Sequence, residues 1–271
     1  MSITRFIRDI GILCVSALGV SILYRNHLQK NAPLVRVLVF HDVQDASWFE
    51  NVLRLLTSEY HIVSPEDVRE GRFHTTKINV LVTFDDGYAS WVTVCAPLLT
   101  KYKVQALFFV NSGLADNYGD ETKRKAYVTD RLLLGRRDTI SWDGVRTLVE
   151  GGHTIGGHTV SHVRLSELPH DKVNEEIEKD KIRIETETKR TLWAFAYPFG
   201  NTSDYTNEVV ESVKRVGYTH AYTTEGVFVK NGDSYRISRM CVEDNQTITS
   251  LKHWISGGYD IYRMIKKLCV R

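Results

Sequence analysis

The segment "LVTFDDGYAS", Leu81–Ser90, decides the fold, because two adjacent acids end an apolar run. Val80–Phe84 predicts a buried strand, and a charge beside such a strand is costly unless it is paired or binds a metal. Asp-Gly is also a hairpin signal, and a hairpin would put a second strand directly after Gly87. The chain continues instead with "YASWVTVCAPLLTKYK", whose apolar residues have helical spacing. The segment therefore predicts a strand, a turn and a helix, with the acid pair at the carboxyl end of the strand.

Apolar strands alternate with helices over the rest of the chain. Further strands are expected at 34–40, 104–110, 153–159, 191–200, 218–224 and 235–240. Helices are expected between them at 47–60, 141–152, 166–189 and 207–217, and residues 111–140 look like a polar insertion. Parallel strands need crossover helices, so this order predicts a parallel sheet or a barrel. In such folds sites are built at the carboxyl ends of the strands.

The bulk composition is that of an ordinary globular protein. The 271 residues suit one α/β domain, with 42% hydrophobic and 25% charged residues. A net charge of +2 gives no electrostatic basis for a nucleic acid partner. The 4 cysteines include no C-x-x-C pair, which argues against zinc ribbons and thioredoxin chemistry.

The amino end differs from the rest of the chain. Ile10–Tyr24 carries no charge and follows a short basic start, which fits a signal peptide or a signal anchor slightly shorter than the ~20 residues of a full span. No small-residue cleavage site follows, which favours an anchor; a buried soluble helix is the third interpretation. The predicted organisation is a signal segment at 1–24, a linker at 25–33 and the main domain at 34–271. The first two interpretations place a membrane-anchored or secreted domain outside the cytoplasm.

A second informative stretch is "GGHTIGGHTVSH", Gly151–His162, which places His158 and His162 four residues apart. Neutral imidazoles are the commonest metal ligands, and two histidines with one carboxylate describe a catalytic metal site. Either Asp85 or Asp86 could complete the set. The other acid could then take a proton from water during an attack on a carbonyl.

Three motifs in order resemble the polysaccharide deacetylases of the NodB-homology family, carbohydrate esterase family 4. They are "TFDDGY" (Thr83–Tyr88), "HTVSH" (His158–His162) and "FAYPFG" (Phe195–Gly200). The resemblance implies a distorted (β/α) barrel with about seven units. It also implies metal-dependent removal of N-acetyl groups from an N-acetylglucosamine polysaccharide.

The resemblance also implies roles for individual residues. Asp85 matches the family's catalytic base, and Asp86, His158 and His162 match its metal triad. The implied cofactor is a divalent ion, zinc in the first place, with cobalt or nickel as alternatives. The implied partner is the polysaccharide substrate. The N-terminal segment separately predicts a membrane as a second partner.

The third motif carries the remaining implied roles and one departure. Tyr197 matches the residue whose backbone N–H helps to form the oxyanion hole, and Phe199 would shape the wall of the groove. Many members carry an arginine two residues before the proline of this motif, where this chain has Ala196. That arginine orients the base, so its role is unfilled or is supplied elsewhere.

The fourth and fifth family motifs, the second of which gives the general acid, are not found. The early segment "VLVFHDV", Val37–Val43, resembles instead the first strand of the poly-β-1,6-N-acetylglucosamine deacetylases, which supplies the acid histidine in that branch. His41 is therefore the candidate acid. Two alternatives remain open: an esterase for O-acetylated polysaccharides, and a non-catalytic carbohydrate-binding protein on the same fold.

Overall fold

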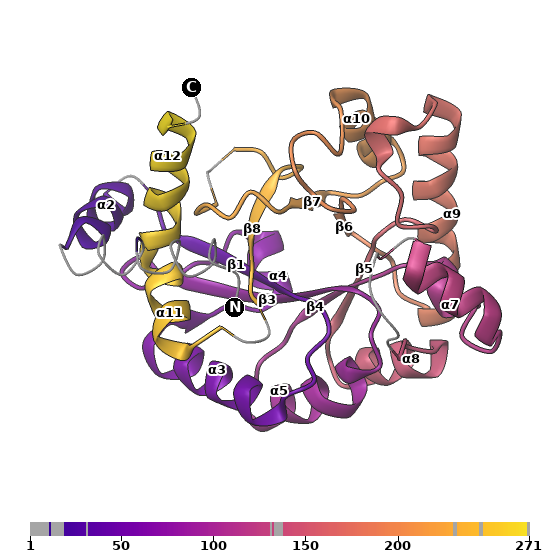
Figure 1. The fold of residues 1–271 in the computed structure, drawn as a ribbon, viewed down its shortest axis with the longest axis horizontal. Helices are drawn as coiled ribbons and strands as arrows, with labels where there is room; N and C mark the ends of the chain where they lie inside the picture. The colour runs from indigo at the N-terminus through magenta and orange to yellow at the C-terminus, as the bar shows by residue number, and fades with distance from the viewer. Residues whose placement is uncertain are drawn as a thin grey trace.

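The computed structural model describes residues 11, 19–30, 32–130, 132, 138–229, 232–243 and 246–269. Seven parallel strands close into a barrel, since β1 pairs with both β3 and β8 (Figure 1). A short further strand, β2 (His61–Ile62), pairs with the start of β3. The barrel strands are β1 (Val35–Phe40), β3 (Asn79–Asp86), β4 (Leu107–Val110), β5 (Thr154–Gly157), β6 (Ala194–Ala196), β7 (His220–Thr223) and β8 (Ile237–Cys241). The prediction of a distorted barrel with about seven units is confirmed.

Helices surround the barrel and join most of the consecutive strands, as parallel pairing requires (Figure 1). Several begin at side chains that accept a hydrogen bond from the first turn, namely Asp45, Ser64, Ser141 and Thr206. The helices on the barrel are α3 (Ala46–Glu59), α4 (Pro65–Glu70), η1 (Trp91–Cys95) with α5 (Ala96–Lys101), α8 (Trp142–Glu150), α9 (His170–Thr188) and α10 (Asn207–Arg215). The chain also forms the short turn η2 (Leu165–Glu167) and the C-terminal group α11 (Ile248–His253), η3 (Trp254–Gly258) and α12 (Tyr259–Cys269).

The two faces of each barrel strand contribute to two different cores. On β3, Val82 and Phe84 belong to the outer core beneath the helices, where Phe84 stacks on Phe108 with ring centroids 4.6 Å apart. Leu81 belongs to the smaller cluster that fills the barrel. Because successive strand residues point to opposite faces, Asp85 shares the inward face of Leu81. The strand thus delivers one acid of the pair into the barrel mouth.

Helices α6 (Ser112–Asp116) and α7 (Glu121–Asp130) lie within the predicted insertion at 111–140. They follow β4, so they leave the barrel at the carboxyl ends of the strands. The insertion is therefore placed on the face where the acid pair lies.

The segment expected as a linker at 25–33 is helical in its first part. Helix α2 (Val20–Gln29) packs against η3 and the outer core through Tyr24 and Leu28, and Ser21 is buried. Most of the predicted signal segment at 1–24 lies outside the described residues. Within the described part of the chain, no helix has the length and apolar character needed to cross a membrane.

Candidate metal centre and catalytic site

The strand register gathers the predicted site residues at one end of the barrel. Phe40 of β1 pairs with Phe84 of β3, and Asp86 at the end of β3 pairs with Val110 of β4. Val110 in turn pairs with Gly157, the last residue of β5. The residues that follow these strands therefore leave the barrel at one level, although they are more than a hundred positions apart along the chain.

Three predicted ligands meet at this edge. Asp86 Oδ1 lies 3.5 Å from His158 Nε2 and 3.3 Å from His162 Nε2, and all three side chains are buried. One donor atom from each lies within 4.8 Å of the other two. Such proximity of two imidazole nitrogens and one carboxylate oxygen is the geometry of a ligand set for a divalent ion.

The hydrogen bonds at the triad test whether a cation fits there. His158 Nδ1 lies 2.7 Å from the carbonyl of Ala196, which can only accept, so Nδ1 carries the proton and the Nε2 lone pair faces Asp86. Asp86 Oδ1 is buried and has no hydrogen-bond partner among the described residues. A buried acceptor that faces a lone pair is unfavourable without a cation. The donor set therefore fits a bound metal ion.

Backbone strain is concentrated around the triad. Six non-glycine residues of the described chain have a left-handed φ, and four of them lie here: Asp86 (86°), Thr159 (67°), His162 (49°) and Phe199 (62°). Such conformations cost about 1–3 kcal/mol each and persist where the surrounding structure enforces them. The turn at Asp86 also explains how two adjacent acids serve one site. Asp85 keeps the strand direction, and Asp86 turns towards the histidines.

Asp85 is held by an arginine that the sequence patterns did not single out. Arg239 of β8 donates from Nη1 to Oδ1 at 2.6 Å and from Nη2 to Oδ2 at 2.7 Å, and both residues are buried. Its Nε also donates to the carbonyl of Thr223 at 3.1 Å. Burial raises the pKa of Asp85, but the Arg239 guanidinium, followed by His158, outweighs it and holds the pKa below its usual value. Asp85 is therefore ionised at neutral pH.

Arg239 gives Asp85 the guanidinium contact that the resemblance would place at Ala196. Ala196 lies in the cluster inside the barrel, but its side chain ends at Cβ. The guanidinium reaches Asp85 from a different strand. The sequence signal was Arg239 in the predicted strand "YRISRM". It stands two residues after Ile237 and therefore lies on the same inward face of the strand. A charged residue at an inward barrel position needs a partner of opposite charge.

His41 directly follows β1 and is exposed at the mouth of the barrel. The pairing of Phe40 with Phe84 places it next to Asp85 in register. Its backbone carbonyl accepts a hydrogen bond from the Trp91 indole at 3.0 Å, which fixes this strand end. The structure thus brings His41 to the site, and its role as an acid stays a prediction.

The prediction that the Tyr197 amide forms the oxyanion hole is wrong. That amide donates to the carbonyl of Tyr222 at 3.1 Å, since the pairing of β6 with β7 continues one residue further. The Tyr197 phenol is also engaged, donating to the carbonyl of Tyr235 at 3.1 Å. Phe199 lies two residues on, with its ring centroid 4.8 Å from that of His162. Its amide donates no hydrogen bond to any described residue.

A buried carboxylate on α9 supports the loop that carries the histidines. Asp180 accepts from the amide of His158 at 2.9 Å and from the amide of Ser112 at 2.9 Å. Burial raises its pKa to about 7. Asn111 donates to the carbonyl of Thr159 at 3.2 Å from the other side. The ends of β4 and β5 and the middle of α9 are therefore joined directly behind a candidate metal ligand.

Comparisons with known proteins agree with this arrangement. The sequence profile of the family described as "Polysaccharide deacetylase" matches residues 73–221, more than half of the chain. A relative from Bacillus subtilis (strain 168), described as "Putative polysaccharide deacetylase YxkH", is 24% identical over 179 residues, 66% of this chain. The chain spans just over half of that relative, 56% of its length.

Solved structures share the fold at low sequence identity. The Streptococcus pyogenes deacetylase PplD in complex with acetate has a TM-score of 0.69 and 20% identity, covering 83% of this chain and 99% of that one. IcaB from Ammonifex degensii has a TM-score of 0.64 and 23% identity, with coverage of 84% and 97%. The BpsB deacetylase domain from Bordetella bronchiseptica has a TM-score of 0.63 and 19% identity, with coverage of 77% and 96%. With the profile match across the acid pair, both histidines and the Pro-Phe-Gly turn, this chain belongs to the polysaccharide deacetylase family.

Proposed function

We propose that the chain is a metal-dependent hydrolase that removes N-acetyl groups from an N-acetylglucosamine-containing polysaccharide. One observation carries the proposal: the donor atoms of Asp86, His158 and His162 converge beside Asp85, which Arg239 holds ionised. A ligand set next to a separate buried base is what metal-assisted hydrolysis requires.

Asp86, His158 and His162 would hold the ion. Zinc suits two imidazoles and one carboxylate, and cobalt or nickel suits the same donors. When bound, the ion would lower the pKa of water and polarise the acetyl carbonyl. Asp85 accepts a proton from the attacking water, and Arg239 keeps its carboxylate ionised and oriented.

Two further groups complete the proposed reaction. The Phe199 amide, which has no acceptor among the described residues, would donate to the oxyanion that forms at the acetyl carbon. His41 would donate a proton to the sugar nitrogen as the carbon–nitrogen bond breaks, and acetate and a free amine leave. An acid from the first strand supports a substrate of the poly-β-1,6-N-acetylglucosamine type.

The charge pattern of the amino end supports a location outside the cytoplasm. Fifteen residues, Ile10–Tyr24, carry no charge, and we propose that they direct the chain to the membrane as an anchor or a signal. Cell fractionation with protease accessibility tests this. A chain protected from external protease and recovered wholly in the cytoplasm contradicts it.

The deciding experiment measures acetate release from β-1,6-linked N-acetylglucosamine oligomers by the full chain, with and without added zinc. Asp86→Ala, His158→Ala and His162→Ala should each lose bound metal. Asp85→Asn should keep the metal and lose turnover by at least about 10²-fold, the usual contribution of a general base. A fully active Asp85→Asn variant would end the proposal for this residue.

His41→Ala separates the amide from the ester alternative. An amine leaving group needs protonation, whereas an alcohol is a better leaving group and depends less on an acid. The variant should therefore lose acetate release from the N-acetylated oligomer and retain more of any release from an O-acetylated one. Unchanged release from the N-acetylated oligomer would overturn the acid role.

A further inference from the structure

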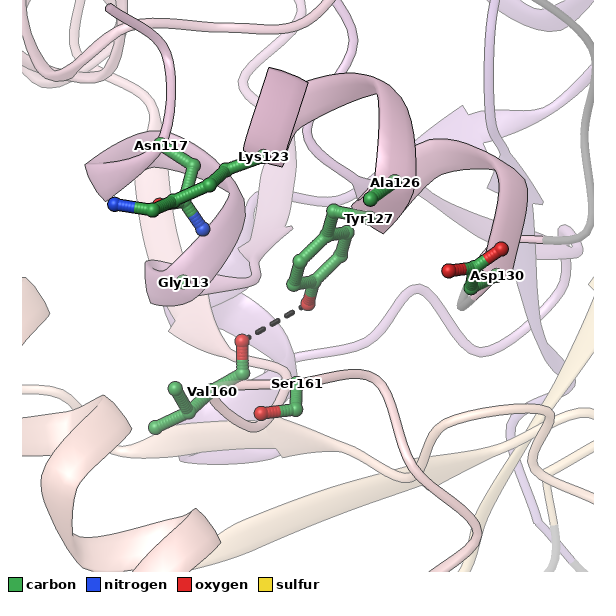
Figure 2. Close-up of a pocket in the computed structure, with 8 residues that line it drawn as sticks. All are labelled: Gly113, Asn117, Lys123, Ala126, Tyr127, Asp130, Val160 and Ser161. Carbon is green, nitrogen blue, oxygen red and sulfur yellow. Dashed lines mark hydrogen bonds between the residues drawn. The ribbon is translucent and has the colours of Figure 1, made fainter. Parts of the chain in front are cut away.

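The loop after β5 carries both candidate histidine ligands, and different parts of the molecule hold its two halves. In the first half, the carbonyl of Val160 accepts from the Tyr127 hydroxyl at 2.9 Å, the dashed line in Figure 2, and from the Gly113 amide at 3.1 Å. Helices α6 and α7 therefore fix the loop as far as Val160. In the second half, the His162 ring packs on the ring of Phe199, which belongs to the turn after β6.

The Phe199 ring contacts a cation as well as the candidate ligand. The guanidinium carbon of Arg164 lies over this ring, 4.2 Å from its centroid. A cation in this position is attracted by the electron-rich face of the ring. Arg164 stands two residues after His162, so the segment that supplies the ligand also supplies the cation. The backbone of Phe199 is left-handed, with φ 62°, and such a conformation persists only where its surroundings enforce it.

A buried carboxylate holds Arg164 in this position. Arg164 Nη1 donates to Asp204 Oδ1, and the Asp204 side chain has no exposed surface. Asp204 Oδ2 accepts from the Asn201 amide at 2.8 Å, and the Asp204 carbonyl accepts from the Ser166 amide at 3.1 Å. Asp204 therefore joins the loop after β5 to the turn after β6. Because a buried carboxylate without its cation is costly, the guanidinium is kept beside it.

We propose that Arg164 is a positioning residue for the candidate ligand His162 and that it acts through the Phe199 ring. The guanidinium, held by Asp204, keeps this ring packed on the imidazole and so fixes the direction of His162 Nε2, which lies 3.3 Å from Asp86 Oδ1. The same contact orients the Phe199 amide. The inference rests on the proposed function and adds to it a residue that does not belong to the ligand set.

The zinc affinity of the full chain, measured by competition with a chelator, tests this role. Arg164→Met removes the cation, and Phe199→Leu removes the ring but leaves the ion pair with Asp204. Each change should raise the Kd for zinc by about tenfold, the cost of losing a group that orients a metal ligand. Arg164→Lys keeps a cation for the ring and for Asp204, so its Kd should stay within about threefold of the wild-type value.

The double variant shows whether Arg164 acts through Phe199. If it does, Arg164→Met with Phe199→Leu should raise the Kd for zinc by about tenfold, no more than either single change. Independent contributions would multiply to about a hundredfold.

Arg183→Met is the matched control. The Arg183 side chain is 38% exposed and that of Arg164 is 39% exposed. The Arg183 guanidinium also lies over an aromatic ring, 5.0 Å from the centroid of Trp142, and forms an ion pair with Asp116. Because none of these groups belongs to the ligand set, Arg183→Met should leave the Kd for zinc unchanged.

Acetate release at saturating zinc gives a second measurement. Arg164→Met and Phe199→Leu should each lower kcat by about tenfold with KM unchanged, because the Phe199 amide loses its direction towards the oxyanion. Arg183→Met should keep the wild-type kcat.

The outcomes separate this role from the proposed function. A wild-type Kd for zinc in either Arg164→Met or Phe199→Leu, or a hundredfold increase in the double variant, would overturn the positioning role and leave the proposed function intact. If Arg164→Met does not fold, the Kd of Phe199→Leu decides by itself. No acetate release by the wild type from any oligomer would remove the proposed function, and the zinc measurements would still decide the role of Arg164.

Discussion

At the residue scale, the pairing of Asp85 with Arg239 defines a testable division of labour. Both carboxylate oxygens are held by one guanidinium. Arg239→Met leaves the carboxylate buried without its cation, so its orientation and its ionised form are both less favoured. We expect kcat to fall by about 10²-fold while metal content is unchanged. Steady-state kinetics and metal analysis of the same folded preparation measure both quantities.

A second arginine, introduced at another position, distinguishes the loss of Asp85 orientation from general damage to the barrel. Ala196 also faces the barrel interior, so an arginine there could approach Asp85 from β6. Arg239→Met with Ala196→Arg should recover part of kcat. A variant whose kcat stays near the wild-type value without any arginine would contradict the role assigned to Arg239.

The triad was predictable and the partner of the base was not, for a physical reason. Asp86 stands at the end of its own strand, and His158 and His162 have the spacing of metal ligands. Each of these signals lies within a short stretch of the sequence. Arg239 becomes relevant only when the barrel closes and brings β8 to β3. The prediction for the Tyr197 amide failed for a related reason, because the neighbouring strand decides whether an amide is free to donate to a ligand.

At the element scale, β5 connects the buried His153, which directly precedes it, with the candidate ligand His158, which directly follows it. The His153 ring is buried against Phe108, with centroids 5.3 Å apart, and its Nδ1 accepts from the amide of Ala106 at 3.3 Å. Burial lowers its pKa to about 4. The sequence predicted a strand at 153–159, but not the burial of His153.

His153 should make stability depend on pH. The unfolded chain binds a proton near pH 6.5, and the folded chain binds it only near pH 4. The contribution of His153 to the free energy of unfolding is therefore fully present above about pH 6.5. It is lost as the pH falls to about 4, and the loss is about 3 kcal/mol. His153→Gln should remove this component, and the exposed His170→Gln should not. Urea unfolding at pH 7 and pH 4.5 measures it, and equal pH dependence in His153→Gln and wild type would contradict it.

At the scale of the whole molecule, barrel closure assembles the site from both ends of the chain. The family profile matches residues 73–221, which contain Asp85 and the triad of Asp86, His158 and His162. His41, directly after β1, and Arg239 on β8 lie outside that range, and these two strands pair with each other. The strand–helix alternation predicted a parallel sheet or a barrel, and the family resemblance implied the barrel. The local segment Val37–Val43 singled out His41, whereas the position of Arg239 beside Asp85 depends on barrel closure, which no local pattern encodes.

A buried ion pair joins the first barrel strand to the last helix. Arg36 lies 2.5 Å from Asp260 of α12, and neither side chain is exposed. Arg36 also lies 3.7 Å from the centroid of the Phe228 ring, and Asp260 accepts from the Phe228 amide at 2.7 Å. Asp260→Ala leaves a buried guanidinium without its partner, and we expect a loss of about 3–5 kcal/mol in the free energy of unfolding.

The double change separates the charge from the packing. Arg36→Met with Asp260→Leu leaves no uncompensated charge, so it should destabilise the fold less than Asp260→Ala alone. The partly exposed pair of Arg236 and Asp233 is the control, and Asp233→Ala should lose less than about 1 kcal/mol in the free energy of unfolding. Urea unfolding of the full chain compares the three variants. If the double variant were the least stable of the three, the ion pair itself would contribute net stability to the contact between β1 and α12. We expect instead that the double variant is more stable than Asp260→Ala. Apolar packing then holds α12 on the barrel, and the ion pair fixes the register of α12.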